Sequence, residues 1–305
     1  MGGTVMTVRG PVSGSDLGIT LPHEHLQIDL YRMSRNRDGY VDDLGLAIIE
    51  ARQFAEAGGR TMVDLTTDCI GRDPLMLRQV AEETGLNIIM GCGYYRNPYI
   101  DESVNKTSVR AITQWIVDEI EHGVRDTGIR PGVIGECGVE REWVTPLEER
   151  ALRGAARAQR ITGLPMSLHA TRSPIGLELL TILEEEGADL RRVALSHCDN
   201  YPHPDFHEAV AKRQAYVEFD RHDPRWPWEQ ERRVANIREL ARRGYLHQIL
   251  ISHDICHISE RAAYGGPGYC YVLEGVVPML RDAGFSEEEI HIILVENPRR
   301  WLTGE

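Results

Sequence analysis

Short apolar runs alternate with amphipathic stretches along the whole chain. The runs are rich in Val, Ile and Leu and predict buried strands, whereas the stretches between them have the apolar spacing of helices. The predicted strands are Gly18–Leu21, Thr61–Leu65, Asn87–Met90, Gly132–Glu136, Pro165–His169, Val193–His197, Ala215–Phe219 and Gln248–Ser252. The predicted helices are Asp43–Ala57, Pro74–Thr84, Val109–Gly123, Leu147–Thr162, Ile175–Glu186, Asp205–Arg213, Glu229–Arg243, Leu273–Ala283, Ser286–Leu294 and Pro298–Leu302.

Eight repeated β–α units predict an α/β fold of the (β/α)8 TIM-barrel type, with residues 1–305 forming one domain. The main alternative is a doubly wound open sheet. No GxGxxG motif opens a helix, and eight units exceed the commonest open-sheet forms, so we favour the barrel. Residues Thr4 to Val12 precede the first barrel strand and predict a short β-hairpin over the bottom of the barrel.

Composition narrows the possible partners. The formal net charge of -13 argues against a nucleic-acid partner, because phosphate binding requires a basic face. None of the six cysteines forms a CxxC pair, so the sequence indicates neither a zinc ribbon nor a thioredoxin-type motif. The N-terminus has no apolar signal region and no stretch has the length of a membrane span, so we expect a cytoplasmic protein with a small-molecule substrate and no membrane contact.

Metal-ligand residue types follow five of the predicted strands. Chemistry in a barrel of this type gathers at the carboxyl ends of the strands, so these side chains share one rim. His23 and His25 are two residues apart, and in an extended chain both point to the same side. The candidate ligands are His23, His25, Glu136, His169, His197 and Asp254. Four histidines and two carboxylates exceed the three protein ligands of one catalytic zinc, and they suit two divalent metal ions about 3.5–4 Å apart.

Each candidate ligand also has a structural interpretation. A single histidine after a strand is often a hydrogen-bonded structural residue, Glu136 could form an isolated salt bridge, and Asp254 could cap the next helix. All of these interpretations must hold at once for the metal site to be absent. Five strand ends placing ligands on one rim favour the metal site.

Five segments together resemble the phosphotriesterase-like family of the amidohydrolase superfamily. They are Thr20–Leu26 (TLPHEHL), Val133–Gly138 (VIGECG) with Thr145–Glu149 (TPLEE), Ser252–His257 (SHDICH), Tyr264–Tyr269 (YGGPGY) and Leu294–Arg300 (LVENPRR). The resemblance implies that one metal, the more buried, is held by His23, His25 and Asp254, that His169 and His197 hold the other, and that Glu136 bridges them. It also implies a pair of zinc ions, with manganese or cobalt as substitutes, and a homodimer.

Position 136 departs from part of that family. The organophosphate-hydrolysing members and the related lactonases carry a carboxylated lysine after the fourth strand, where this chain has Glu136. The phosphotriesterase homology proteins have a glutamate there, and this chain resembles them more. A glutamate bridges two metals without carbon dioxide, and its presence argues against efficient paraoxon hydrolysis.

The resemblance and the residues together predict a hydrolase that uses a metal-bridging hydroxide, with Asp254 receiving its proton. A lactone or other carboxylic ester is the first choice of substrate, because Tyr95 and Arg221 resemble positions that contact the substrate in family lactonases. Tyr95 could instead be a packing aromatic, and Arg221 a surface salt-bridge residue. The alternatives are an N-acyl amide, or a phosphoester with weak phosphotriesterase activity. A binding protein without catalysis would have lost ligands, and none is lost.

Overall fold

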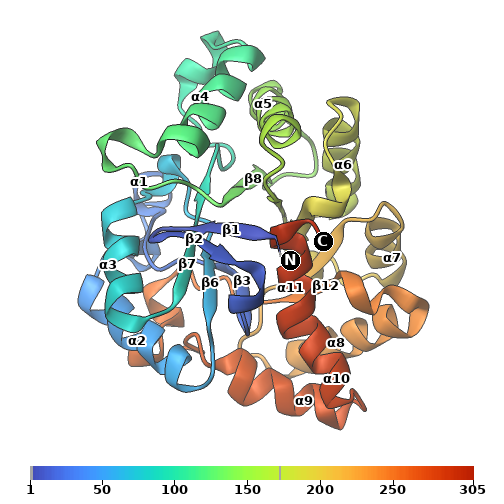
Figure 1. Ribbon diagram of the computed structural model, residues 1–305. Coiled ribbons are helices and arrows are strands. Elements are labelled where there is room, and N and C mark those ends of the chain that lie inside the picture. Colours follow the sequence, from blue (N-terminus) through green and yellow to red (C-terminus); the bar gives the residue numbers. More distant parts are fainter. Residues whose placement is uncertain (1–2, 172) are drawn as a thin grey trace.

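A computed structural model describes residues 3–171 and 173–305 and contains the expected barrel of parallel strands (Figure 1). In chain order the barrel strands are β3 (Thr20–Glu24), β6 (Thr61–Asp64), β7 (Asn87–Cys92), β8 (Val133–Val139), β9 (Met166–Ala170), β10 (Val193–Ser196), β11 (Tyr216–Phe219) and β12 (Ile249–Ile251). Each strand pairs in parallel with the next one along the chain, so the sheet follows chain order and the predicted barrel is confirmed. The carboxyl ends of all these strands therefore meet at one rim.

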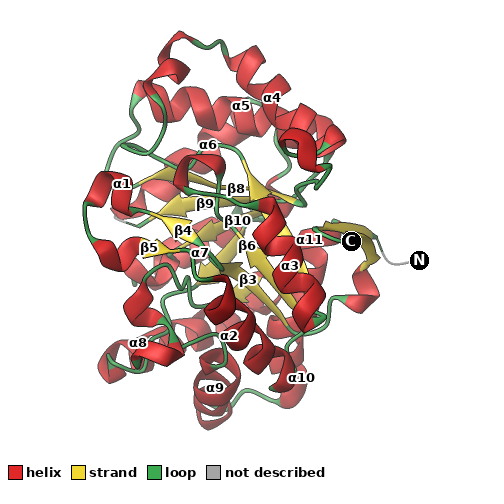
Figure 2. Ribbon diagram, turned by 90° about the vertical axis from the view of Figure 1, so that its left-hand side faces the viewer, coloured by secondary structure: helices red, strands yellow, loops and turns green. Residues whose placement is uncertain are grey.

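Helices surround the strands on the outside (Figures 1 and 2). They are α2 (Leu44–Glu56), α3 (Pro74–Thr84), α4 (Val109–His122), α5 (Pro146–Thr162), α6 (Gly176–Glu185), α7 (Pro204–Lys212), α8 (Pro227–Leu240), α9 (Val277–Asp282), α10 (Glu287–His291) and α11 (Asn297–Thr303). Side-chain caps determine several starts: Asp43 accepts from the Leu46 N–H, and Thr145 forms a capping box with Glu148. The predicted helix positions agree with these bounds to within a few residues.

Two of the predicted C-terminal helices are interrupted. The segments Val272–Val276 and Ile292–Glu296 are wide π-helical turns, which lead into α9 and α11. Pro278 and Pro298 follow these turns, and neither has the backbone N–H that would continue a regular α-helical ladder. The predictions of unbroken helices over Leu273–Ala283 and Ser286–Leu294 were therefore wrong in this detail.

The predicted hairpin is present and lies against the amino-terminal end of the barrel. Strand β1 (Thr4–Thr7) pairs antiparallel with β2 (Gly10–Ser13), and the Val8 N–H donates to the carbonyl of Ile88 near the start of β7 (2.9 Å). In Figure 1 the hairpin and α11 lie in front of the barrel strands. Val5 and Trp301 pack with the side chains that fill the barrel interior, which include Val63, Leu65, Ile89, Val133, Ala194 and Leu250.

The first strand and its loop differ from prediction. Strand β3 continues to Glu24 rather than ending at Leu21, so His23 lies within the strand, and its pairing with β6 shifts register between Leu21 and Glu24. The loop that follows contains a two-stranded antiparallel sheet, β4 (Ile28–Asp29) and β5 (Tyr40–Val41), and the short helix α1 (Tyr31–Ser34). No apolar period marks these short elements in the sequence.

Side chains join β3 to the end of β12 and bring the two ends of the barrel sheet together. Ser252 Oγ lies 2.8 Å from the His23 carbonyl and 2.8 Å from Glu24 Oε1. The fully buried Glu24 also accepts hydrogen bonds from the His253 N–H (3.0 Å), His253 Nδ1 (2.8 Å) and the Ile255 N–H (3.1 Å). This carboxylate therefore holds the segment that carries Asp254 against the first strand.

Within residues 3–171 and 173–305, no helix is both long enough and apolar enough to cross a bilayer.

Replacing Glu24 by glutamine is expected to lower the free energy of unfolding by about 2–4 kcal/mol, because the amide nitrogen cannot accept these buried hydrogen bonds. Urea unfolding followed by circular dichroism measures the change. Glu83→Gln is the matched control, since the Glu83 side chain is 54 % exposed and its contact with Arg52 is 3.8 Å. Equal shifts in the two variants would contradict a structural role for Glu24.

Candidate metal centre

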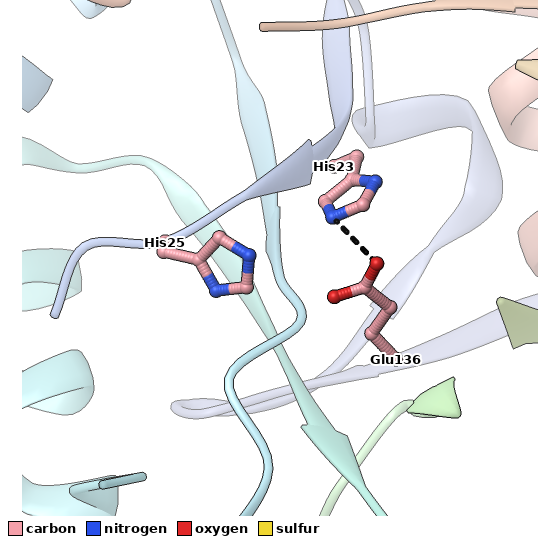
Figure 3. Close-up of side chains that lie close together, drawn as sticks. All are labelled: His23, His25 and Glu136. Carbon is pink, nitrogen blue, oxygen red and sulfur yellow. Dashed lines mark ion pairs between the residues drawn. The ribbon is translucent and has the colours of Figure 1, made fainter. Parts of the chain in front are cut away.

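The six predicted ligands meet at the carboxyl-terminal rim of the barrel. His23, Glu136 and His169 lie within β3, β8 and β9. His25 and His197 directly follow β3 and β10, and Asp254 lies three residues after the end of β12. All six side chains are buried. Their ligand atoms fall into three overlapping groups, each within 4.8 Å: His23, His25 and Glu136; His23, His197 and Asp254; and Glu136, His169 and His197. Figure 3 shows the first group, with His23 directed at Glu136.

Each of the four imidazoles has one nitrogen bound to a side chain behind it. Nδ1 of His23 and Nδ1 of His197 each lie 2.9 Å from an oxygen of the same carboxylate, Asp220. His25 Nδ1 lies 2.9 Å from Thr66 Oγ1, which itself donates to the Gln27 carbonyl. His169 Nε2 lies 3.2 Å from Glu140 Oε2. These contacts orient the rings and leave the opposite nitrogen of each toward the centre of the site.

The inward nitrogens face the two carboxylates. His23 Nε2 is buried without a hydrogen-bond partner and lies 3.7 Å from Glu136 Oε1 and 3.6 Å from Asp254 Oδ1. His25 Nε2 lies 3.2 Å from Asp254 Oδ1. His169 Nδ1 and His197 Nε2 lie 2.5 Å and 2.9 Å from Glu136 Oε1. Buried imidazole nitrogens and carboxylate oxygens that converge in this way fit divalent transition metals, and Glu136 stands between the two groups of histidines.

Without metal, the charges of the site raise the pKa values of two of the histidines, His23 and His197. Burial alone would lower the pKa of His23, but Glu136 and Asp254 outweigh it and hold this pKa well above its ordinary value. For His197, Asp220 and Glu136 outweigh burial and raise the pKa to about 10. Burial would raise the pKa of Glu136, but His169 and His23 hold it well below its ordinary value. The site therefore attracts positive charge strongly.

Two of the ligands have unusual backbone conformations. His197 and Asp254 have φ angles of 60° and 54°, in the left-handed region that disfavours residues other than glycine. Such conformations cost of order 1 kcal/mol or more and gather at functional sites. The Asp254 N–H donates to the His23 carbonyl (3.2 Å), and the His197 N–H lies 3.1 Å from both oxygens of Asp220. The surrounding contacts thus hold both backbones in place.

Three residues behind the histidines were missed by sequence reasoning: Asp220, Thr66 and Glu140. Asp220 directly follows β11, so its position at a strand end was a usable signal. Thr66 and Glu140 follow β6 and β8 in the same way, but neither residue type is specific enough to indicate a role by itself. Glu24, which lies between the predicted ligands His23 and His25 and is not among them, faces the β12 side of the barrel.

A cavity of about 420 Å³ opens beside the six ligands. Its walls include His169, His197 and Asp254 on the side of the predicted metals, and Tyr95, Arg96, Tyr99, Asn200, Arg221 and His257 elsewhere. The ring of Tyr95 lies 4.9 Å from that of His169. Arg221 Nη1 donates to Asp254 Oδ2 (2.7 Å), and Nη2 lies 3.3 Å from Glu260 Oε1. Tyr95 and Arg221 thus line the cavity, and their contact with substrate stays a prediction.

Comparison with known proteins identifies relatives along the whole chain. A sequence model described as the phosphotriesterase family matches residues 3–302. The phosphotriesterase homology protein of Escherichia coli is 37 % identical over 285 residues, covering 93 % of this chain and 98 % of the relative. The N-acetyltaurine hydrolase of Danio rerio is 33 % identical over 349 aligned residues, covering 99 % of this chain and 98 % of the relative.

A solved structure with a similar backbone is that of a lactonase from Listeria monocytogenes. Its TM-score is 0.92 at 28 % identity, and the match covers 99 % of each chain. The overall backbone of this chain therefore agrees with that of a protein described as a lactonase.

Metal binding is expected to release protons, because His23 and His197 hold protons near neutral pH in the metal-free site and a coordinating imidazole must be neutral. Apparent metal affinity should therefore rise with pH between pH 6 and 8, by about tenfold per pH unit for each proton released. Calorimetric titration of the metal-free protein with Zn²⁺, in two buffers of different ionisation enthalpy, counts these protons. The same heat in both buffers would contradict the prediction.

Asp220→Asn is expected to weaken the binding of both ions, by about 10- to 100-fold each, because Asp220 orients a histidine on either side of Glu136. Thr66→Val, which removes the contact to His25 alone, should weaken the binding of one ion. Zinc content and competition with a chelator measure both effects, and circular dichroism checks the fold. If Asp220→Asn loses only one of the two ions, Asp220 supports the ligands of that ion alone, which would contradict the prediction.

Proposed function

The chain belongs to the phosphotriesterase family of metal-dependent hydrolases, and from this premise we propose that it hydrolyses a lactone or another carboxylic ester with two divalent metal ions. His23, His25 and Asp254 would hold one ion, His169 and His197 the other, and Glu136 would contact both. Zinc is the proposed metal, with manganese or cobalt as substitutes, because ligands of mixed nitrogen and oxygen type suit all three.

One observation supports two ions above all others. Four imidazoles have one nitrogen engaged by a side chain, while their opposite nitrogens face the same pair of carboxylates, Glu136 and Asp254. A single catalytic zinc takes three protein ligands, so one ion would leave part of this set of six unused.

Two ions, when bound, supply a water molecule acidic enough to attack at neutral pH and a Lewis acid for the acyl oxygen. Asp254 lies at the edge of the cavity and is the residue that would accept the proton of the attacking water. Burial would raise the pKa of Asp254, but His23 and Arg221 outweigh it and hold the pKa well below its ordinary value. Asp254 is therefore ionised near neutral pH, as a residue that accepts a proton and passes it on to the leaving alkoxide must be.

Arg221 fixes the orientation of the Asp254 carboxylate. Its guanidinium holds Asp254 Oδ2 at 2.7 Å and contacts the Asp254 carbonyl at 3.2 Å, while Asp254 Oδ1 faces His23 and His25. The two oxygens of the carboxylate thus have different neighbours, one toward the metal ligands and one toward the cavity. This arrangement keeps the proton acceptor beside the place where a bound acyl group would react.

The lactone proposal is supported by Tyr95 and Arg221 on the cavity wall and by the backbone similarity to a lactonase. The ring of Tyr95 is buried against His169 and offers a flat apolar surface to a cyclic substrate.

Hydrolysis of an N-acyl amide is the second candidate. It is supported by relatives described as N-acetyltaurine hydrolases, such as the Danio rerio protein, which match 99 % of this chain. The residues that activate water and accept its proton would be the same for an amide, and the leaving amine would then need the proton that Asp254 carries.

The test is a panel of substrates offered to the zinc-loaded enzyme: a γ-lactone, N-acetyltaurine and paraoxon. We expect turnover of the lactone first, of the acyl amide second, and weak or no turnover of paraoxon. Glu136→Ala should lose bound zinc and all activity while the barrel stays folded by circular dichroism, and Glu142→Ala, an exposed glutamate nearby, is the matched control. Full activity in Glu136→Ala, or one zinc per chain in the wild type, would overturn the proposal of two ions.

A further inference from the structure

Resting on the proposed hydrolysis of an acyl compound, we propose that Arg96 binds an anionic group of the substrate. The physiological substrates would then be esters or amides that carry a carboxylate, a sulfonate or a phosphate at a short distance from the bond that is cleaved. The inference rests on the cavity walls, on the hydrogen bonds of the two cavity arginines, and on the rings that hold Arg96.

The cavity extends from the predicted metal ligands to Arg96. Glu140 Oε2 lies 3.2 Å from His169 Nε2 and 3.3 Å from Arg96 Nη2, so one carboxylate connects a metal ligand to this guanidinium. Arg96 is therefore close enough for a small substrate to reach it while its acyl group lies beside Asp254. The cavity wall also includes polar uncharged side chains, those of Ser34, Asn36, Thr171 and Asn200. Thr171 Oγ1 is buried without a hydrogen-bond partner.

Arg96 has donors left for a ligand. A guanidinium has five N–H groups. Arg96 Nη1 donates to the Asn97 carbonyl (3.0 Å), Nη2 lies near Glu140, and Nε is buried without a partner. Nη1 and Nη2 each carry a second N–H, and these are the donors that an oxyanion in the cavity would take. The fork of a guanidinium also matches the paired oxygens of a carboxylate, sulfonate or phosphate.

Two tyrosine rings hold the guanidinium in position. Its central carbon lies 4.8 Å from the ring centre of Tyr95 and 5.3 Å from that of Tyr99, and the two rings are 5.5 Å apart. Stacking on aromatic faces fixes the plane of the guanidinium. A fixed cation loses little conformational entropy when it binds, which favours a role in recognition.

Among the described residues of the cavity wall, the other arginine is Arg221, and it is already engaged. Arg221 contacts the side chain and the carbonyl of Asp254 and lies 3.3 Å from Glu260. Drawing it toward a substrate anion would remove a neighbour of Asp254, the residue proposed to accept the proton. Arg221 and Arg96 therefore have different roles in this proposal. Arg221 orients Asp254, and Arg96 binds the end of the substrate that lies away from the cleaved bond.

The test compares substrates of similar size that differ in charge: N-acetyl-β-alanine and its neutral primary amide, and a γ-lactone bearing a carboxylate and the same lactone bearing a primary carboxamide. In the zinc-loaded wild type we expect kcat/KM to be about 10- to 100-fold higher for each anionic member. Arg96→Gln should reduce this ratio to near one, chiefly by raising KM for the anionic member, and Arg96→Lys should restore part of it.

The matched control is Arg141→Gln. Arg141 is exposed and stacks on Trp143 (5.5 Å) outside the cavity, so its loss removes the same charge and a similar ring contact but should leave the ratio at the wild-type value. Zinc content of each variant shows whether Glu140 still orients His169. Binding of N-acetyl-β-alanine to the metal-free protein, measured by calorimetry in the wild type and in Arg96→Gln, is a readout independent of turnover and should be lost in the variant.

The outcomes separate the two proposals. If the wild type hydrolyses charged and neutral members equally, or if Arg96→Gln keeps the preference, the anion site is wrong and the hydrolase proposal stands. If no acyl compound is hydrolysed but the metal-free protein binds N-acetyl-β-alanine through Arg96, the hydrolase proposal fails and the anion site stands.

Discussion

The contact between the first and last barrel strands is the constraint on which the site depends. His23 and His25 are useful as a pair only if Asp254, from the far end of the chain, lies beside them. Glu24 makes this happen, because it points away from the two histidines and accepts hydrogen bonds from His253 and Ile255, the residues on either side of Asp254. Side chains alternate in direction along an extended chain. His23 and His25 therefore face the metal centre, whereas Glu24 between them faces the last barrel strand and connects it to the first.

Asp220 has a comparable position for the opposite side of the site. A single carboxylate contacts a histidine from β3 and a histidine that follows β10, and so ties two groups of ligands to one another. The pKa directions agree with this geometry, because buried acids raise the pKa values of the metal-free His23 and His197. The site therefore holds positive charge both with and without metal ions. Whether protons or metal ions carry that charge depends on pH and on metal supply.

The barrel and the six predicted ligands could be inferred from the sequence because both depend on local signals: apolar runs of strand length, and ligand residue types where those runs end. The rest depends on tertiary contacts. Asp220, Thr66 and Glu140 act through histidines on other strands, and no spacing along the chain reveals which acid lies behind which ring. The end of β3 was misplaced because a register shift carries the strand on to Glu24. The small β4–β5 sheet was missed because strands of two residues have no measurable period.

The separation of 229 residues between His23 and Ser252 has a consequence for how the protein obtains its metal in a cell. During synthesis the first two histidines emerge early, but the residue that completes their side of the site is made near the end of the chain. A nascent chain therefore exposes ligands that cannot yet enclose an ion, and any ion captured then is held by a partial set and is easily lost. Stable loading belongs to the finished, closed barrel, so the order of events is folding first and metal second.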